Sequence, residues 1–326
     1  WTIDQALENP NCNLVGVADS HEHLIKKAKE KLPEKIRLFE DYRQMLEELK
    51  PDAAMIITPN NEHLEVLLEC AKRGIHCFVQ KPMATSYADA VKMEEAARRS
   101  GIELMVNCFS LWRPELRECL RLYREGKIGP ALKFIAYNGH QGHRGIGVLT
   151  EDYINWLYDP VRSGGGALAD QASYAINYAV YMLGLPETVY AVTHIIKLHE
   201  NTNVEDDSVV VLKYPSATAV IQGSYIWPFA KSEVQVYGSA GGLMLKDQSL
   251  RYEHVYSKET PSQKKIDEIA IPETAPEAKN GITHFIHSLQ HHKPFEEAQT
   301  AIFNTKVMRV VDAAYESAKT GSPVQF

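Results

Sequence analysis

Short apolar runs alternate with helical segments through the first hundred residues of the chain. Runs of about four to six apolar residues, separated by helices of about ten or more, are typical of a parallel sheet covered on both faces. The pattern predicts strands at 13–18, 37–39, 53–57, 76–79 and 102–106. It predicts helices at 21–32, 41–49, 62–73 and 86–99.

The pattern changes after Pro114, where alternating strands follow one another with short turns. Consecutive strands of this kind predict an open, mainly antiparallel sheet with helices on one side. The expected strands are 132–137, 188–198, 207–214, 217–225, 233–237 and 243–245. The expected helices are 114–125, 151–158, 167–183, 279–290 and 298–320, with loops at 139–147 and 261–279. We therefore expect an α/β protein with one domain at 1–108 and a second at 109–326.

Composition limits the classes of protein that fit. A chain of 326 residues with 44% hydrophobic residues is expected to form two ordinary globular domains. The net charge of −7 and the lack of basic runs argue against nucleic-acid binding. No apolar run approaches the roughly 18 residues of a membrane-spanning helix. The five cysteines are an odd number without C-x-x-C spacing, which favours free thiols and a cytoplasmic location.

Polar residues gather where the predicted parallel strands end, which is where such sheets bind ligands. An acid at Asp19 would accept hydrogen bonds from an adenosine ribose and would repel a 2′-phosphate, although Ser20 and nearby lysines weaken this preference. The alternatives are a helix cap at Asp19 and an ordinary strand-to-helix turn at 58–63. The residues expected to bind a cofactor are Asp19, Ser20, Thr58, Pro59, Asn60, His63, Gln80, Lys81 and Asn107.

Lys81 closes a buried strand immediately before Pro82. A lysine in this position lies where a nicotinamide ring and a substrate would meet. Partial burial lowers the pKa of an ammonium group, so such a lysine can exchange a proton with a hydroxyl near neutral pH. The alternative is a solvated lysine at the end of a strand.

A run of three glycines opens an apolar helix that carries Asp170, Tyr174 and Asn177. Asp170 and Tyr174 are four residues apart, so they share one helix face. Buried polar groups are costly without partners, and a carboxylate with a phenol here therefore indicates a site. The alternative is an acid that the helix dipole favours.

The loop at 139–147 carries His140, His143 and Arg144. These side chains fit the mouth of a pocket that binds a sugar. Two histidines three residues apart could also ligate a metal, but no third ligand has suitable spacing. We therefore predict substrate contacts here and no metal site.

The order and spacing of these motifs make the chain resemble the Gfo/Idh/MocA oxidoreductases over nearly its whole length. The resemblance implies a Rossmann domain that binds NAD or NADP, followed by an open-sheet α/β domain through which a homodimer or homotetramer forms. The motifs are Ala18-Asp19, Thr58-Pro59-Asn60-x-x-His63, Gln80-Lys81-Pro82, Trp112-Arg113-Pro114, Gly126-Lys127-Ile128-Gly129, the segment 164–177 and Tyr237-Gly238-Ser239-Ala240-Gly241-Gly242.

The resemblance also implies roles for the site residues. Lys81 corresponds to the lysine of the family's E-K-P motif, with Gln80 in place of glutamate. Asp170 and Tyr174 correspond to its D-x-x-x-H pair, with tyrosine in place of histidine, and Asn177 replaces a commoner aspartate. The tyrosine form is similar to the branch that contains glucose–fructose oxidoreductase and dimeric dihydrodiol dehydrogenase.

A phenol has a reference pKa near 10, so Tyr174 would need a cation such as Lys81 to act as a base. We expect Lys81 and Tyr174 to handle the proton and Asp170 to orient the substrate. The residues expected to contact substrate are Trp112, His140, His143, Arg144 and Asn177.

The implied function is NAD(P)-dependent hydride transfer to or from a sugar, cyclitol or related polyol. One alternative is an NAD-dependent glycosidase that oxidises its substrate transiently. Another is a catalytically silent sugar- or nucleotide-binding regulator, which Gln80 favours.

The family begins with a strand and a G-x-G-x-x-G turn that binds the pyrophosphate at a helix N-terminus. No such turn precedes Asp19, and Trp1 aligns with the end of that first helix. We expect the first strand, the glycine turn and most of a helix, roughly 20–30 residues, to be missing from this chain.

Overall fold

Each of the five apolar runs near the start of the chain forms a parallel strand. The computed structural model describes residues 2–146, 150–196, 202–256 and 265–326. Strand β1 (Gly16–Ala18) pairs with β2 (Arg37–Phe39), and a separate sheet contains β3 (Ala53–Ile56), β4 (His76–Gln80) and β5 (Leu104–Asn107) in that order. All three pairings are parallel, which confirms the predicted type of sheet.

Helices connect these strands, and polar caps set where several of them begin. They are α1 (Thr2–Glu8), α2 (Glu22–Lys31), α3 (Tyr42–Leu49), α4 (His63–Lys72) and α5 (Tyr87–Ser100). The Asp41 carboxylate accepts a hydrogen bond from the Arg43 amide at 2.8 Å, and the Ser86 hydroxyl accepts one from the Asp89 amide at 3.1 Å. These side chains satisfy amide groups that the first turn of a helix leaves unpaired.

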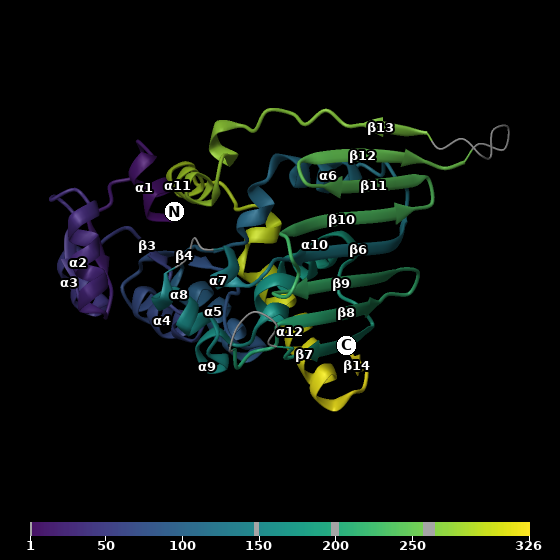
Figure 1. Cartoon of the computed structure of the whole chain (residues 1–326). Coiled ribbons are helices and arrows are strands. Elements are labelled where there is room, and N and C mark those ends of the chain that lie inside the picture. Colours follow the sequence, from purple (N-terminus) through teal and green to yellow (C-terminus); the bar gives the residue numbers. More distant parts are fainter. Residues whose placement is uncertain (1, 147–149, 197–201, 257–264) are drawn as a thin grey trace.

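The second domain is built on a nine-stranded sheet (Figure 1), in the order β13-β12-β11-β10-β6-β9-β8-β7-β14. Only β6 and β9 pair in parallel, so the prediction of a mainly antiparallel sheet is confirmed. The strands are β6 (Ala131–Gly139), β7 (Thr188–His194), β8 (Asp207–Lys213), β9 (Thr218–Ser224), β10 (Lys231–Gly238), β11 (Gly241–Lys246), β12 (Ser249–His254), β13 (Ile266–Glu268) and β14 (Val324–Gln325).

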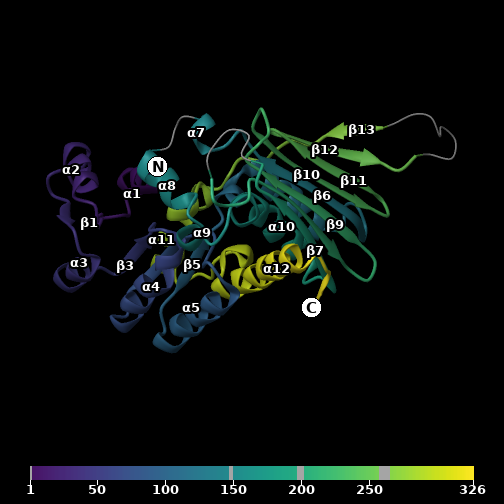
Figure 2. The same ribbon diagram turned by 60° about the horizontal axis from the view of Figure 1, so that its bottom comes forward.

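Helices cover one face of this sheet and connect it to the first domain. Helix α10 (Ser173–Leu183) packs on β6 and β9, and α12 (Ala301–Thr320) packs on β7, on α10 and on α5 of the first domain. Figure 2 shows α12 between α5 and the sheet. The remaining helices are α6 (Pro114–Arg124), α7 (His143–Ile146), α8 (Glu151–Leu157), α9 (Pro160–Ser163) and α11 (Gly281–His291). One continuous core therefore includes side chains from both domains.

Three predicted segments differ in detail. The expected loop at 261–279 contains β13 and the 3-10 turn η4 (Pro276–Ala278), while 261–264 lie outside the described residues. The expected strand at 188–198 ends at His194, and 197–198 are outside the described residues. The loop at 139–147 includes the short helix α7, with residue 147 outside the description. Among the described helices, none is long and apolar enough to cross a membrane.

The predicted helix 167–183 begins with a wider turn. Residues Leu168–Ala172 form a π-helical stretch, η3, before α10 continues as a regular α-helix. Such stretches often occur at functional sites, and this one contains Asp170.

Candidate active site

Lys81 and Asp170 form a half-buried ion pair between the two domains. Lys81 follows β4, and its Nζ donates to Asp170 Oδ1 at 2.5 Å and to the Asp170 carbonyl oxygen at 2.6 Å. Their side chains are only 13% and 17% exposed. Two amino acids that lie 89 positions apart in the chain thus meet beyond the carboxyl end of a parallel strand, where the sequence predicted a site.

The other Asp170 oxygen accepts three further hydrogen bonds. His143 Nε2 lies 3.2 Å from Oδ2, Gln171 Nε2 lies 2.6 Å away, and the Tyr225 hydroxyl lies 2.9 Å away. Burial of Asp170 opposes its ionisation, yet Lys81 and His143 together hold the pKa of this carboxyl well below its usual range. Asp170 is therefore an ionised hub with four donors around it. We expected it to orient substrate, but its oxygens are already engaged with protein groups.

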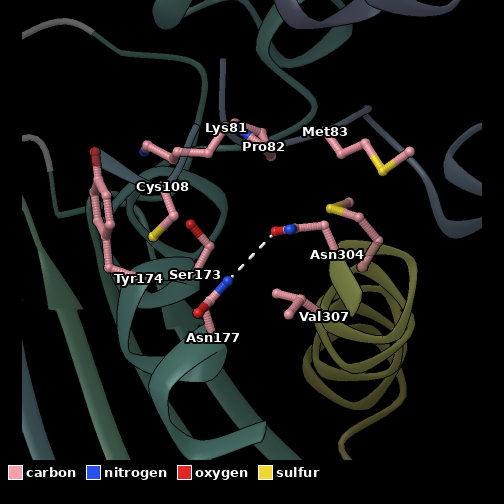
Figure 3. Close-up of a pocket in the computed structure, with 10 residues that line it drawn as sticks. Lys81, Pro82, Met83, Cys108, Ser173, Tyr174, Asn177, Asn304 and Val307 are labelled. Atoms are coloured by element: carbon pink, nitrogen blue, oxygen red, sulfur yellow. Dashed lines mark hydrogen bonds between the residues drawn. The ribbon is translucent and has the colours of Figure 1, made fainter. Parts of the chain in front are cut away.

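Tyr174 lies beneath the ammonium group of Lys81. Nζ is 4.1 Å from the centroid of the phenol ring, a cation–π distance. Tyr174 and Asp170 both contact Lys81, so they lie on the same side of their helix. Figure 3 shows Tyr174 beside Lys81. Burial and the charge of Asp170 raise the pKa of Tyr174 well above 10. We expected Lys81 to let this phenol act as a base; burial and the charge of Asp170 act on its pKa in the opposite direction and favour the protonated hydroxyl, which can donate a hydrogen bond.

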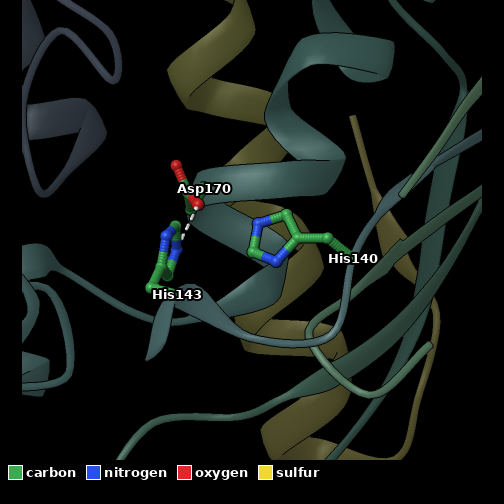
Figure 4. A group of neighbouring side chains, drawn as sticks. All are labelled: His140, His143 and Asp170. Atoms are coloured by element: carbon green, nitrogen blue, oxygen red, sulfur yellow. Dashed lines mark hydrogen bonds and ion pairs between the residues drawn. The ribbon is translucent and has the colours of Figure 1, made fainter. Parts of the chain in front are cut away.

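Aromatic side chains surround the two histidines near Asp170. The His140 ring stacks on Tyr225 with ring centroids 5.4 Å apart. The His143 ring lies beside Asp170 and meets His140 edge-on at 4.7 Å (Figure 4). Burial, with a contribution from His143, lowers the pKa of His140 to about 4. His143 of the predicted pair contacts Asp170 directly, while His140 Nε2 lies 3.2 Å from Gln171 Nε2, which itself donates to Asp170.

His140, His143 and Asp170 have potential ligand atoms within 4.8 Å of one another. Asp170 is a third ligand that the local spacing of the histidines could not reveal. The donor set nevertheless fits a hydrogen-bonded cluster better than a metal centre. A divalent cation here would face the Lys81 ammonium and would displace the amide and hydroxyl hydrogens of Gln171 and Tyr225 from Asp170.

Tyr225 and Gln171 are functional neighbours that the sequence analysis missed. Tyr225 directly follows β9, and Gln171 is fixed by Asn138 of β6, whose amide donates to Gln171 Oε1 at 2.8 Å. The alternation of β9 did indicate that residue 225 ends a strand. It could not indicate that this end faces Asp170, because that depends on how β9 lies under η3.

Asp19 and Ser20 lie at the carboxyl end of β1, as predicted. The Asp19 carboxylate accepts a hydrogen bond from the His21 amide at 2.9 Å, but the alternative role as a helix cap is wrong, because the N-cap of α2 is His21. Ser20 is exposed. Both side chains are half-exposed or exposed and accessible to a ligand.

Thr58 and Pro59 follow β3 at the next strand ends. The Thr58 hydroxyl oxygen is buried and has no hydrogen-bond partner among the described residues. A buried hydroxyl without a partner is costly, so a group supplied from outside the chain fits here.

Asn60 and His63 face inward instead. The Asn60 amide donates to the Ser163 carbonyl oxygen at 2.7 Å, which ties the first domain to α9. The two ring nitrogens of His63 lie 3.2 Å from the Met83 carbonyl oxygen and 3.1 Å from that of Thr58. Complete burial lowers the pKa of His63 to about 4. These residues shape the strand-end loops, and the structure does not aim their polar atoms at a ligand.

Gln80, Asn107 and Trp112 form a chain of internal hydrogen bonds. Asn107 donates to Gln80 Oε1 at 3.2 Å and accepts from the Trp112 indole nitrogen at 3.0 Å, while Gln80 donates to the Thr2 hydroxyl at 3.2 Å. Trp112 is buried and its ring packs on His284. The structure therefore does not bring Trp112 to the Asp170 cluster, where a substrate contact was expected.

Asn177 and Arg144 also differ from their expected placement. Asn177 is buried behind Lys81, and its amide reaches Asn304 of α12 at 3.4 Å beside a cavity of about 20 Å³ (Figure 3). That volume has room for about one water molecule, not a sugar. Arg144 is paired with Glu151 at 3.1 Å on the rim of the site. Asn177 thus lies below the site and Arg144 at its edge.

Family models match both parts of the chain. Residues 3–108 match the model described as an oxidoreductase family with an NAD-binding Rossmann fold, and residues 116–244 match the GFO/IDH/MocA C-terminal domain.

Named relatives are about a quarter identical to the chain over the residues that align. The myo-inositol 2-dehydrogenase of Thermotoga maritima is 24% identical over 233 residues, which covers 70% of this chain and 66% of the relative. The NADP(+)-dependent scyllo-inositol 2-dehydrogenase of Bacillus subtilis is 24% identical over 198 residues, covering 59% and 52%. The chain therefore aligns with about half to two thirds of these relatives' lengths.

A solved structure shows the same fold over nearly all of the chain. The WlbA dehydrogenase of Bordetella pertussis, solved with NADH and UDP-GlcNAcA, superposes with a TM-score of 0.81 at 20% identity and covers 100% of this chain and 95% of its own. Its arrangement of a parallel sheet followed by an open mixed sheet is that described above.

Proposed function

The chain belongs to the Gfo/Idh/MocA oxidoreductase family, and from this we propose that it transfers a hydride between NAD or NADP and a sugar, cyclitol or related polyol. The observation that carries the proposal is the buried ion pair of Lys81 and Asp170 beyond the end of β4. Relatives named as inositol dehydrogenases support the class of substrate.

Lys81 is the proposed proton-transfer residue. The nicotinamide supplies or accepts the hydride when it is bound. In the reducing direction, Nζ of Lys81 gives a proton to the carbonyl oxygen as it gains charge, and in the oxidising direction the neutral amine removes the hydroxyl proton. Asp170 holds Nζ in place through two hydrogen bonds, to its carboxylate and to its carbonyl oxygen.

Tyr174 is proposed to hold the reacting oxygen with Lys81. Its neutral hydroxyl donates a hydrogen bond, which stabilises negative charge on that oxygen. His140 and His143 lie beside Asp170 on the β6–α7 side, and Arg144 next to them is paired with Glu151. These groups suit a substrate with several hydroxyls, because each such hydroxyl needs a polar partner when it is buried.

The proposed cofactor contacts follow the strand ends. The Asp19 carboxylate would hold the ribose hydroxyls, and Thr58 with Pro59 would lie along the nucleotide, with Ser20 beside the ribose. Asn60, His63, Gln80 and Asn107 would act by shaping these loops, because their polar atoms already bind other parts of the chain.

Binding and turnover test the proposal separately. Thermal-shift titrations with NAD, NADH, NADP and NADPH should raise the melting temperature for one cofactor pair. Absorbance of the reduced nicotinamide with a polyol panel should then show net oxidation. Stabilisation with hydrolysis but no net redox change would indicate a glycosidase that oxidises its substrate transiently. Binding of sugar or nucleotide with neither reaction would indicate a silent regulator, and no stabilisation by any nucleotide would contradict the proposal.

We propose that the chain forms a homodimer or homotetramer through the open face of the nine-stranded sheet. Outward side chains of β7, among them Tyr190 and Val192, are apolar and exposed, and apolar sheet faces of this kind are typical of interfaces. Light scattering on the purified protein would show the assembly. We also propose a cytoplasmic location, which the five unpaired cysteines support.

A further inference from the structure

The start of the helix that carries Asp170 is held by a buried pair outside the site, Glu205 and Tyr315. Glu205 lies in the segment before β8, and Tyr315 lies on α12. Glu205 Oε1 accepts hydrogen bonds from the Gly166 amide at 2.8 Å, the Leu168 amide at 3.0 Å and the Tyr315 hydroxyl at 2.8 Å. The amide of Ala169 donates to the Tyr315 oxygen at 3.1 Å.

These contacts satisfy the amides that the first turn of a helix leaves unpaired. The Ala167 amide completes the set by donating to the Glu205 backbone carbonyl at 2.8 Å. Four consecutive amides, from Gly166 to Ala169, therefore bind to Glu205 or Tyr315. The next residue is Asp170, so its position is fixed directly by this arrangement.

The glycines at 165 and 166 leave the space that Tyr315 and Glu205 occupy against the backbone. A Cβ on Gly165 would lie 1.8 Å from the Tyr315 hydroxyl oxygen, and one on Gly166 would lie 2.0 Å from the Glu205 carbonyl oxygen. Gly165 also has φ of 144°, which side chains rarely adopt. Close approach of Tyr315 thus requires glycine at 165, and close approach of the Glu205 backbone requires glycine at 166.

The same helix, α12, also holds the segment that carries Lys81. Asp312 lies three residues before Tyr315 and accepts a hydrogen bond from the Tyr87 amide at 2.8 Å, at the first residue of α5. That amide lies six residues after Lys81. One face of α12 therefore contacts the Lys81 segment through Asp312 and the Asp170 helix through Tyr315.

We propose that Tyr315 and Glu205, together with Asp312, are positioning residues that set the Lys81–Asp170 geometry for proton transfer. The inference rests on the proposed dehydrogenase function. The mechanism is geometric: release of the η3 start lets the Asp170 carboxylate shift, and Nζ of Lys81 leaves the position that the reacting oxygen needs. A shift of about 1 Å at a reacting group can lower the rate by roughly 100-fold.

The test compares Tyr315→Phe with Tyr252→Phe. Both remove one hydroxyl from a largely buried tyrosine, but Tyr252 donates to the Ala240 carbonyl oxygen between β10 and β11, away from η3. We expect Tyr315→Phe to lower kcat by roughly 10- to 100-fold, with unchanged affinity for the nucleotide. The pH dependence of kcat/KM should shift, because the environment of Lys81 changes. Tyr252→Phe should leave kcat and the pH profile unchanged.

Two substitutions of Glu205 give a second test of the proposal. Glu205→Gln keeps the shape and one accepting oxygen, so it should retain more activity than Glu205→Leu. An unchanged pH profile and kcat in Tyr315→Phe, with only a lower melting temperature, would overturn the proposal. Equal activities of Glu205→Gln and Glu205→Leu would also count against it.

Hydrogen exchange separates this inference from the proposed function. Amides of 166–170 should exchange faster in Tyr315→Phe than in Tyr252→Phe, whether or not the protein turns over a polyol. A wild-type protein without dehydrogenase activity would refute the proposed function, while unchanged exchange at 166–170 would refute the positioning role.

Discussion

Nζ of Lys81 lies 4.1 Å above the ring of Tyr174 while it binds the carboxylate of Asp170 at 2.5 Å. The ammonium group therefore has two kinds of partner, an anion and a π-face, and both come from one helix. Because the phenol offers its face to the cation, Lys81 stabilises the ring without making the hydroxyl acidic. In the proposed mechanism the two residues divide the chemistry: Lys81 moves the proton, and Tyr174 holds the oxygen.

Replacement of Lys81 should abolish most turnover. We expect Lys81→Met to lower kcat by about 10²–10⁴-fold, the range that general acid–base catalysis contributes. Lys72→Met is the matched control, because Lys72 also forms an ion pair, with Glu69 at 2.5 Å, but on the exposed surface of α4. Steady-state kinetics of both variants check the prediction. Near wild-type kcat in Lys81→Met would remove Lys81 from the proton-transfer step.

Tyr174→Phe isolates the hydroxyl from the ring. Phenylalanine keeps the π-face beneath Lys81, so the melting temperature should change little, while kcat falls by roughly 10-fold or more through loss of the donor to the reacting oxygen. Tyr123→Phe is the control. It also removes one tyrosine hydroxyl, which on α6 donates to the Met182 carbonyl oxygen of α10 at 2.7 Å. If the rate of Tyr174→Phe equals that of the wild type, the phenol has no part in catalysis.

The buried His63 should make the fold sensitive to acid. Its pKa is about 4 in the folded protein, against about 6.5 in an unfolded chain. Between these values the unfolded state binds more protons, so stability is complete above about pH 6.5 and falls as the pH drops towards 4. His140 titrates in the same window, because its folded pKa is also about 4.

Denaturant midpoints measured from pH 7 to pH 4 test this prediction. His63→Gln should be less stable at pH 7, because it loses a bridge between two loops, but its stability should depend less steeply on pH. His76→Gln is the control on β4, because the His76 ring is only half-buried and accepts a hydrogen bond from the Glu103 amide at 2.9 Å near the surface. Parallel pH curves for wild type and His63→Gln would contradict the prediction.

Asp19 should influence the choice of nucleotide. Asp19→Ala removes the charge that would repel a 2′-phosphate, so the ratio of NADP to NAD affinity should rise, by roughly 10-fold for about 1.4 kcal/mol of lost repulsion. Asp41→Ala is the control. Like Asp19, Asp41 accepts a hydrogen bond from the backbone amide two residues later, at the start of α3. An unchanged ratio in Asp19→Ala would place the ribose elsewhere.

Local patterns predicted the parallel strands and their polar ends, because strand burial and strand termini are encoded in a few neighbouring residues. They also led to Lys81, Asp170 and His143, which the structure brings together. They could not distinguish polar residues that face a ligand from those that bind another part of the chain. Asn60, His63 and Trp112 belong to the second group, and their partners are 20 or more positions away in two of the three cases.

Tyr225 and Tyr315 could not be predicted from the sequence for the same reason: their hydrogen-bond partners are far away along the chain. Tyr225 lies 55 positions from Asp170, and Tyr315 lies 110 positions from Glu205. Each looks like an ordinary core tyrosine in its own element. The packing of β9 against η3 brings Tyr225 to Asp170, and the packing of α12 places Tyr315 at the start of the helix that carries Asp170.

The placement of α12 has a consequence for domain exchange. This helix comes from the end of the chain, yet Asp312 binds the start of α5 and the Thr305 hydroxyl contacts Met83 Sδ at 4.0 Å. A chimera that receives residues 1–108 from another protein, to change its nucleotide, would therefore meet a foreign surface at α12. Such a chimera should be most stable when the α12 residues that contact the first domain are also taken from the donor protein. The exchangeable domain therefore consists of two segments that are far apart in the sequence.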